Sequence, residues 1–75
     1  MLDQIAASDK VRSKILYAAS ALYARKGFAA TSIEEISGKA GVSLPVTYHY
    51  VKKKSEIMRM IFEDVLNIFR QSLVE

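Results

Sequence analysis

The sequence contains no cysteine, one proline, three glycines and a single histidine among its 75 residues. Without cysteine, neither a disulfide nor a thiolate metal site can stabilise the chain, and the redox compartment stays undetermined. Because proline and glycine are so few, long loops are not expected and helices are favoured. The sequence also lacks a metal-binding motif, a glycine-rich phosphate-binding loop and a motif for a catalytic nucleophile. We therefore expect no enzyme, no metal and no other cofactor.

Long apolar runs are also missing. The uncharged stretch over residues 15–24 is too short and too mixed in character to cross a bilayer. The first four residues lack the basic start of a secretory signal. We therefore expect a cytoplasmic protein without a membrane partner. The net charge of +3 is compatible with nucleic acid, but many proteins that never bind nucleic acid share it.

The spacing of apolar residues predicts one all-α domain, a three-helix bundle with a long fourth helix. Residues 1–8 are expected to form a flexible lead-in, with Ser8 or Asp9 as the N-cap of a first helix over 9–26. Apolar residues recur in that helix at intervals of three and four, which gives it one buried face. Gly27 follows two basic residues and is a strong stop signal.

Capping signals place the next two helices. Ser32 and Glu35 have the spacing of a capping box, which predicts a second helix from residue 32 to Ala40. Gly41 interrupts the pattern, and Ser43 can cap a third helix over 44–51 that has Pro45 in its first turn. Three lysines, residues 52–54, link this helix to the last one, which is expected over 55–74.

The last helix is apolar over most of its circumference. Its polar stripe is narrow, and two apolar ridges flank that stripe. The first ridge contains Ile57, Ile61, Val65 and Ile68; the second contains Met58, Phe62, Leu66, Phe69 and Leu73. A helix of this kind is normally buried on more than one side. Because fifty preceding residues cannot cover both ridges, we expect a further partner for this helix.

Residues 33–51 have the pattern of a helix-turn-helix. Ile36 and Ala40 supply the apolar positions of the first helix, and Ser37 is small enough for a close crossing. Gly41 tolerates a positive φ in the turn, and a buried aliphatic residue, Val42, follows it. Each of these signals is weak alone, but together they favour a helix-turn-helix.

The sequence then resembles a known family. The motifs that carry the resemblance are ILYAA (15–19), LY (22–23), KGF (26–28), TSIEEI (31–36), AGVS (40–43), YHY (48–50) and KKKSEI (52–57). In order and spacing they are similar to the DNA-binding region of TetR-family regulators, over about residues 9–62. Three positions depart from the usual residues: Ser37 replaces an alanine, Thr47 an aliphatic residue and Val51 a phenylalanine. Thr47 is expected to weaken the packing of the recognition helix slightly.

The resemblance implies a function and a domain organisation. Residues 9–54 would form a helix-turn-helix DNA-binding domain. Residues 55–75 would connect it to a ligand-binding and dimerisation domain that is absent from this sequence. The protein would be a homodimeric bacterial repressor that binds a pseudo-palindromic operator in double-stranded DNA and responds to a small-molecule inducer, whose identity the sequence does not give.

Candidate DNA contacts follow from the resemblance on the third helix. Leu44, Pro45 and Val46 occupy its variable positions and are apolar, so they would contact thymine methyl groups. His49 would face the groove and contact a base or a phosphate. The alternative is that this single histidine is an ordinary surface residue without a binding role. Tyr48 is the stronger candidate for a phosphate contact through its hydroxyl. Tyr50 would divide its ring between the core and the DNA backbone.

Three further candidates lie at helix ends. Ser32 and Ser43 are helix caps on any interpretation, and caps that face DNA can also contact phosphate. Lys54 corresponds in the resemblance to a lysine that binds phosphate at a helix N-terminus. The ordinary interpretation of the three-lysine run is a solvated turn.

Two other functions remain open. The helix-turn-helix could serve only to bind another protein, with the last helix as the docking surface. A helix lying on a membrane surface is disfavoured, because the polar stripe of the last helix is mixed in charge and not basic.

Overall fold

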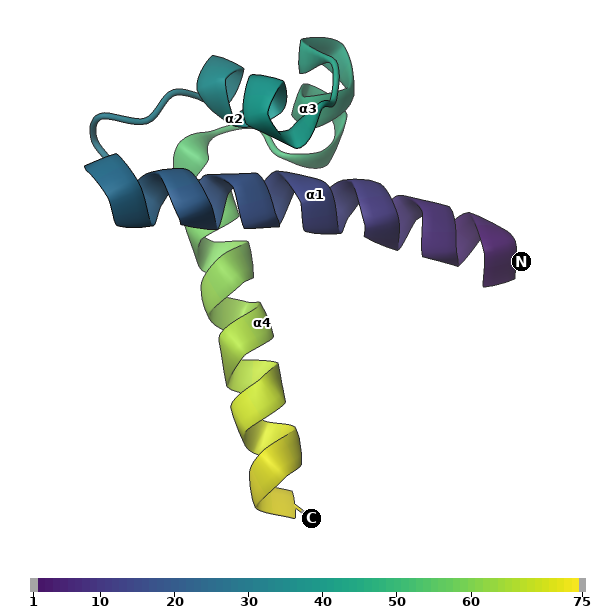
Figure 1. The fold of residues 1–75 in the computed structure, drawn as a ribbon. Coiled ribbons are helices and arrows are strands. Elements are labelled where there is room, and N and C mark those ends of the chain that lie inside the picture. Colours follow the sequence, from purple (N-terminus) through teal and green to yellow (C-terminus); the bar gives the residue numbers. More distant parts are fainter. Residues whose placement is uncertain (1, 75) are drawn as a thin grey trace.

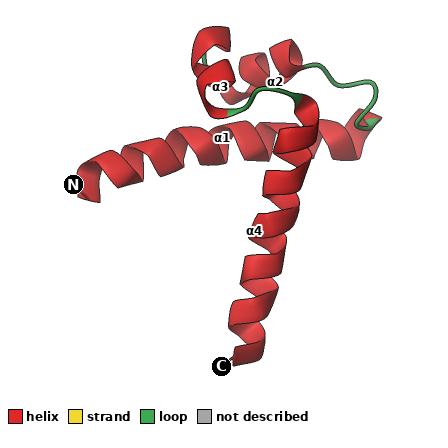
Figure 2. Cartoon of the chain, turned by 180° about the vertical axis from the view of Figure 1, so that it is seen from behind, coloured by secondary structure: helices red, strands yellow, loops and turns green. Residues whose placement is uncertain are grey.

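The computed structural model of the chain describes residues 2–74, which form four α-helices and no strand. The helices are α1 (Leu2–Lys26), α2 (Ile33–Ala40), α3 (Leu44–Tyr50) and α4 (Lys54–Val74). Helices α2 and α3 lie together on one side of α1, whereas α4 crosses α1 and extends away on the other side (Figure 1). The view from behind shows the same crossing, with α4 in front of α1 (Figure 2). The predicted three-helix bundle with a long fourth helix is confirmed.

Helix α1 is longer than the sequence pattern predicted. It begins at Leu2, so the expected start at Asp9 is wrong, and the backbone of the predicted lead-in over residues 2–8 is helical. Residues 2–26 contain no proline or glycine and are rich in alanine and leucine, which have high helix propensities. Ser8 and Asp9 could cap a helix only if the backbone before them left the helical conformation. The other end is as predicted, because Gly27 follows the helix with a φ of 90°.

Helix α2 is defined by its two ends, as predicted. At its start, the Ser32 hydroxyl accepts a hydrogen bond from Glu35 N at 3.1 Å, and the Glu35 carboxylate accepts one from Ser32 N at 3.0 Å. This is the reciprocal capping box. At its end, Gly41 takes a left-handed conformation with φ of 70°, and its N–H donates to Gly38 O at 3.3 Å. The change of direction at Gly41 lets α3 start after a turn of only three residues.

Helices α3 and α4 each differ by one residue from the predicted bounds. Ser43 caps α3 and accepts a hydrogen bond from Val46 N at 3.3 Å, but α3 ends at Tyr50 and Val51 is its extended C-cap. Helix α4 begins at Lys54 and not at Ser55. Differences of one residue at helix ends are ordinary, since terminal turns are the least regular part of a helix.

The core lies where α1 meets α2, the end of α3 and the first turns of α4. Its buried apolar residues are Ile15, Leu16, Ala18, Ala19, Leu22, Ile33, Ile36, Val51 and Ile57. Helix α1 supplies five of these, so it is the scaffold on which the shorter helices pack. Full burial of one aliphatic side chain of this size stabilises a fold by about 1.5–3 kcal/mol.

Only the first turns of α4 pack against this core. Ile57 is fully buried, and Met60 and Ile61 are partly buried against the cluster. Farther along, the apolar side chains of both ridges are exposed, namely Phe62, Val65, Leu66, Ile68 and Phe69, and so is Met58, next to Ile57. Leu73 lies outside the residues whose side chains are described. The prediction that the bundle cannot cover both ridges is therefore confirmed for the described residues.

An ion pair joins α1 to α4 beyond the core. The two terminal nitrogens of Arg12 donate to the two carboxylate oxygens of Asp64, each at 3.2 Å. This parallel arrangement is the directional form of an arginine–carboxylate pair. Both side chains keep about a third or more of their surface exposed, so the pair contributes only ~0.2–1 kcal/mol. Its contribution to the packing of α4 on α1 is therefore small beside that of the buried apolar residues.

Candidate nucleic-acid interface

Helix α3 presents a short exposed face. Pro45, Val46, Tyr48 and His49 are exposed, with 41% of Val46 and 37% of Tyr48 accessible. The opposite face is buried at Thr47 and continues into the buried C-cap, Val51. The helix is thus held by one side while the other side remains available to a partner.

Two predicted contact residues divide their surface between the core and solvent. Leu44 and Tyr50 are partly buried and pack against the core cluster. Part of Tyr50, whose ring lies edge-on to His49 with centroids 5.5 Å apart, contacts the core as expected, and its contact with the DNA backbone stays a prediction. Leu44 has less surface to offer a partner than its neighbour Val46, so the exposed apolar part of the face consists of Pro45 and Val46.

Buried hydroxyl groups fasten α3 to α2. We expected Thr47 to weaken packing, but it is fully buried and its hydroxyl is doubly hydrogen-bonded. Ser37 Oγ donates to Thr47 Oγ1 at 2.8 Å, and Thr47 Oγ1 donates to Ser43 O at 3.0 Å. The sequence pattern placed Ser37 at the helix crossing but gave no sign of this pair, because the two residues are ten positions apart.

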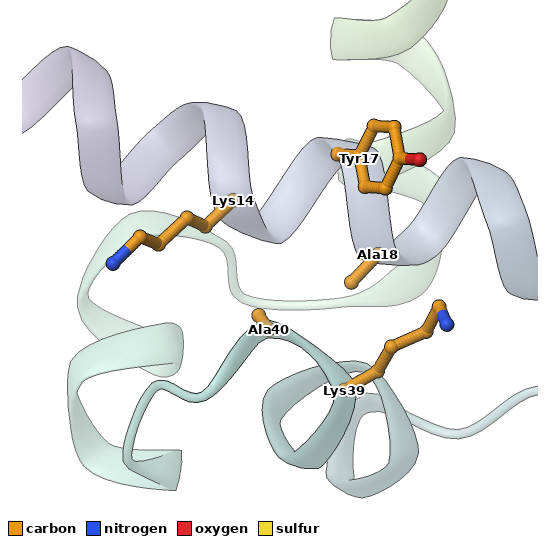
Figure 3. Close-up of a pocket in the computed structure, with 5 residues that line it drawn as sticks. All are labelled: Lys14, Tyr17, Ala18, Lys39 and Ala40. Carbon is orange, nitrogen blue, oxygen red and sulfur yellow. The ribbon is translucent and has the colours of Figure 1, made fainter.

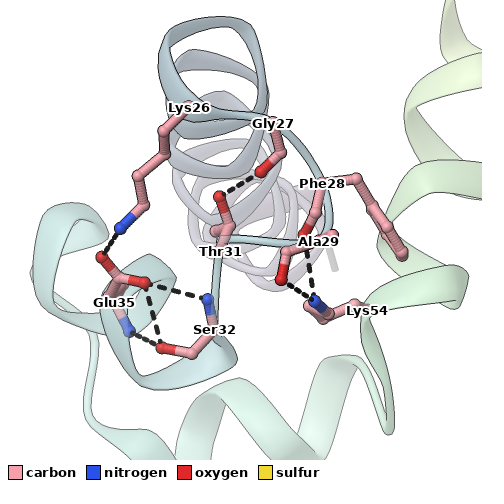
Figure 4. A network of polar contacts seen from close by, with 8 residues as sticks. All are labelled: Lys26, Gly27, Phe28, Ala29, Thr31, Ser32, Glu35 and Lys54. Carbon is pink, nitrogen blue, oxygen red and sulfur yellow. Dashed lines mark hydrogen bonds and ion pairs between the residues drawn. The ribbon is translucent and has the colours of Figure 1, made fainter.

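The N-terminus of α2 carries a small polar network (Figure 4). Ser32 is bound to Glu35 through the capping box, and Glu35 in turn forms an ion pair with Lys26 at the end of α1. The hydrogen bond from Lys26, followed by that from the Ser32 backbone, lowers the pKa of Glu35 below its ordinary value. The Ser32 hydroxyl is therefore already engaged as a cap, and any phosphate contact would be additional.

Lys54 is held by the loop between α1 and α2 (Figure 4). Its ammonium donates to Phe28 O at 3.0 Å and to Ala29 O at 3.5 Å, and it lies 4.7 Å from the centre of the Phe28 ring. The Phe28 ring also packs at a tilt against Tyr23, with centroids 5.2 Å apart. This lysine therefore ties the start of α4 to the loop, a role that the sequence did not indicate.

The charge is concentrated in the part of the chain that carries this face. Residues 9–54 contain nine basic and three acidic residues, a formal charge of +6, although the whole chain has only +3. Lys52 and Lys53 lie exposed directly after α3. The Lys52 ammonium donates to Tyr48 O at 2.8 Å, which brings a cation to the end of the exposed face.

Two hollows lie on the surface of the described residues, and the larger, of about 400 Å³, is lined by the polar residues Lys53, Ser55, Glu56 and Arg59 at the start of α4. A small pocket of about 160 Å³ lies between α1 and the end of α2, lined by Lys14, Tyr17, Ala18, Lys39 and Ala40 (Figure 3). Ligand sites usually have about 300–1,000 Å³, so this pocket is too small for a drug-sized molecule. Within residues 2–74, no acidic or histidine cluster could hold a metal ion, and no helix is long and apolar enough to span a membrane.

The geometry of α2 and α3 defines the class of this domain. Two short helices are joined by a turn of three residues, and the second has one buried and one exposed face. Together with the supporting helix α1, this is a helix-turn-helix domain.

Comparison with known proteins gives the family. Residues 15–61 match the family described as bacterial regulatory proteins, tetR family, and the chain belongs to that family. It is 34% identical over 55 residues to the HTH-type transcriptional activator FasR of Mycolicibacterium smegmatis, covering 73% of this chain and 25% of that protein. It is 36% identical over 52 residues to the transposon Tn10 TetC protein of Escherichia coli, covering 69% of this chain and 26% of that protein. No solved structure matches.

Proposed function

We propose that this chain is the DNA-binding domain of a transcription regulator and that it recognises a specific sequence in double-stranded DNA. The observation that carries the proposal is the exposed face of α3, formed by Pro45, Val46, Tyr48 and His49 within a segment of charge +6. A short exposed helix of this kind fits the major groove of B-DNA, and the surrounding positive charge suits the phosphates.

Each residue of the interface has a proposed role. Pro45 and Val46, with the exposed edge of Leu44, contact thymine methyl groups, and His49 contacts a base edge or a phosphate. Tyr48, and Tyr50 through its hydroxyl, contact the phosphate backbone. Ser32, Ser43 and Lys54 lie at helix N-termini, where backbone N–H groups and the helix dipole favour a phosphate. For Lys54 this requires that its ammonium use a proton not donated to the loop carbonyls.

The chain spans about a quarter of the length of the relatives it matches. We propose that in the longer protein α4 connects this domain to a second domain that dimerises and binds a small-molecule inducer. The exposed ridges of α4 support this arrangement, because an apolar strip of that length usually marks an interface. In a homodimer, two copies of α3 would read half-sites about 34–36 Å apart on a pseudo-palindromic operator.

For the direction of regulation we propose repression, in which the operator-bound dimer blocks transcription. The relative FasR is named an activator, so the direction needs its own test. A reporter gene placed behind the selected operator separates the two: without inducer, a repressor lowers the reporter signal and an activator raises it.

The direct test is selection of bound sequences from random duplexes, followed by Val46→Ala. This change should cost about 1–3 kcal/mol at one or two base pairs of the selected sequence and leave other positions unaffected. If Val46→Ala weakens binding to all duplexes equally, α3 does not read bases.

The phosphate role of Tyr48 has a matched control on α1. Tyr48→Phe removes only the hydroxyl and should weaken binding to every duplex by a similar factor. Tyr17→Phe makes the same chemical change at a site that is 76% exposed and away from α3, so it should leave binding unchanged. Equal effects of the two changes would remove Tyr48 from the interface.

The second candidate function is a protein-interaction module, favoured by the exposed apolar ridges of α4. Salt dependence distinguishes the two functions. Phosphate contacts release counterions, so the logarithm of the DNA affinity should fall linearly with the logarithm of salt concentration. A protein-interaction module would show no such duplex binding at physiological salt.

A further inference from the structure

The two buried hydroxyl groups between α2 and α3 form a directed chain of hydrogen bonds. Ser37 Oγ, on α2, donates its proton to Thr47 Oγ1, and Thr47 Oγ1 donates its own proton to Ser43 O. Ser37 and Thr47 are 4% and 0% exposed, so water does not compete for these groups. Both hydroxyl protons are used within the protein, and the chain ends on the residue that caps α3.

Thr47 is also the residue about which α3 would rotate. It is the buried residue in the middle of a helix of only seven residues. Rotation of α3 about its axis would displace Val46 and His49 sideways relative to whatever the helix faces. Hydrogen bonds weaken steeply away from linearity, so the pair at Thr47 resists such rotation. Apolar contacts between an alanine and an aliphatic residue have no comparable preference for direction.

Thr47 also forms hydrogen bonds with Ser43, the N-cap residue of α3. Ser43 O accepts the Thr47 N–H at 3.0 Å as well as the Thr47 hydroxyl, while Ser43 Oγ accepts from Val46 N. In addition, Val42 N donates to Ser37 O at 3.1 Å. Ser37 therefore holds the turn through its backbone and α3 through its side chain.

We propose that Ser37 and Thr47 are positioning residues that fix the rotation of α3 on α2 and thereby set the base-pair preference of the domain. The proposal rests on the proposed DNA-binding function. Neither residue touches DNA in this arrangement, because both are buried. Their effect reaches the DNA through Val46 and His49, which α3 carries on its exposed face.

The test compares two variants of the full-length protein with opposite expectations. Ser37→Ala/Thr47→Val removes both hydroxyl groups and keeps nearly the same volume, so folding stability should stay close to that of the wild type. Thr47→Ser keeps the hydroxyl but removes a buried methyl group, so it should lower the melting temperature. The readout is the discrimination ratio, which is the affinity for the selected operator divided by that for a shuffled duplex of equal composition at fixed salt.

The expected result separates stability from discrimination. The apolar double variant should lose about fivefold in the discrimination ratio, because the native rotation of α3 then lacks the preference over other rotations that one net hydrogen bond provides. Thr47→Ser should retain the ratio in spite of its lower stability. A double variant that discriminates like the wild type, or a Thr47→Ser variant that loses discrimination as much as the double variant does, would overturn the proposal.

A second measurement keeps this inference separate from the proposed function. Residual dipolar couplings of backbone amides report the orientation of α3 relative to α2 without DNA. The double variant should show a changed or broadened orientation of α3, and Thr47→Ser should not. If the wild type shows no duplex preference, the proposed function fails while the couplings still decide the positioning role. Unchanged couplings in the double variant would refute that role.

Discussion

The exposed face of α3 and the outer part of α4 both present apolar side chains to solvent, but their surroundings differ. On α3, Val46 and Tyr48 are about two-fifths exposed and lie in a segment of charge +6. On α4, Phe62, Ile68 and Phe69 are about two-thirds exposed. Residues 58–74, the outer part of α4, contain two basic and two acidic residues, a formal charge of zero.

This difference indicates two kinds of partner. A small apolar face within positive charge suits the major groove, where methyl groups are flanked by phosphates. A long apolar strip without net charge has no electrostatic attraction to phosphates and suits another protein surface. Exposure of apolar residues alone does not separate the two regions, whereas exposure together with charge does.

The largest expected effect concerns the second domain that we propose as the partner of the exposed ridges of α4. The 75-residue chain alone should bind the selected operator about 10²–10⁴-fold more weakly than a longer chain that includes the proposed dimerisation domain, since linking two binding sites raises the overall affinity by that factor. The measurement is a titration of one duplex at fixed salt with both proteins. Equal affinity and equal footprint length would contradict a dimeric mode of binding.

Two substitutions on α4 compare its buried and exposed parts. Ile57→Ala should cost about 2–5 kcal/mol of unfolding free energy, because Ile57 is fully buried. Phe62→Ala, five residues later, should cost almost nothing in the 75-residue chain, where Phe62 is 64% exposed. Urea unfolding of each variant gives both values.

The same pair sharpens the comparison when it is placed in the longer chain. There Phe62→Ala should become costly, because the second domain would cover the ridge. A cost for Phe62→Ala that remains near zero in the longer chain would show that this ridge is not the domain interface.

The features that sequence predicted well are local ones. The capping box at Ser32 and Glu35, the cap at Ser43 and the left-handed Gly41 each depend on residues within four positions of one another. Their physical cause is the need to satisfy free backbone groups at helix ends, which a short segment reveals by itself. The exposed side of α3, by contrast, is an expectation from the resemblance to TetR-family regulators and not from local spacing.

The features that sequence missed depend on distant residues or on missing interruptions. The contacts of Lys54 with the loop join residues 25 and 26 positions apart, and the pair of Ser37 and Thr47 joins residues on two helices. The predicted start of α1 at Asp9 is wrong because Ser8 and Asp9 are residue types that favour the N-cap position, but the same residue types also occur inside helices. The direct contacts of the candidate site residues with DNA stay predictions.

A substitution of Lys54 tests the basic region, and its expected effect on DNA binding is of intermediate size. If it binds phosphate, Lys54→Ala should weaken binding to every duplex and reduce the slope of log affinity against log salt by about one. The control is Lys53→Ala, which removes an equal charge from the neighbouring exposed residue. If the contacts with Phe28 and Ala29 are the whole role of Lys54, its variant should lose melting temperature while the salt slope stays unchanged.

The smallest expected effect concerns Glu35, which joins α1 to the start of α2 inside the basic region. Its pKa is lowered by the Lys26 hydrogen bond and by the Ser32 N–H, so its ionised form is favoured in the folded state. That contribution to stability is present above the ordinary glutamate pKa of 4.5 and is lost as the pH falls below 4.5 through the lowered pKa. Glu35→Gln keeps an acceptor for the cap but removes the charge. Its melting temperature should therefore lie slightly below that of the wild type at pH 7, and the two should converge as the wild-type carboxylate becomes protonated.

Glu34→Gln, in the same first turn, controls for the general interaction of a carboxylate with the helix dipole and should show the smaller difference at pH 7. A difference for Glu35→Gln that stays constant from pH 7 to pH 3 would mean that the amide perturbs the cap itself, and that the ion pair with Lys26 adds nothing to the stability of this region.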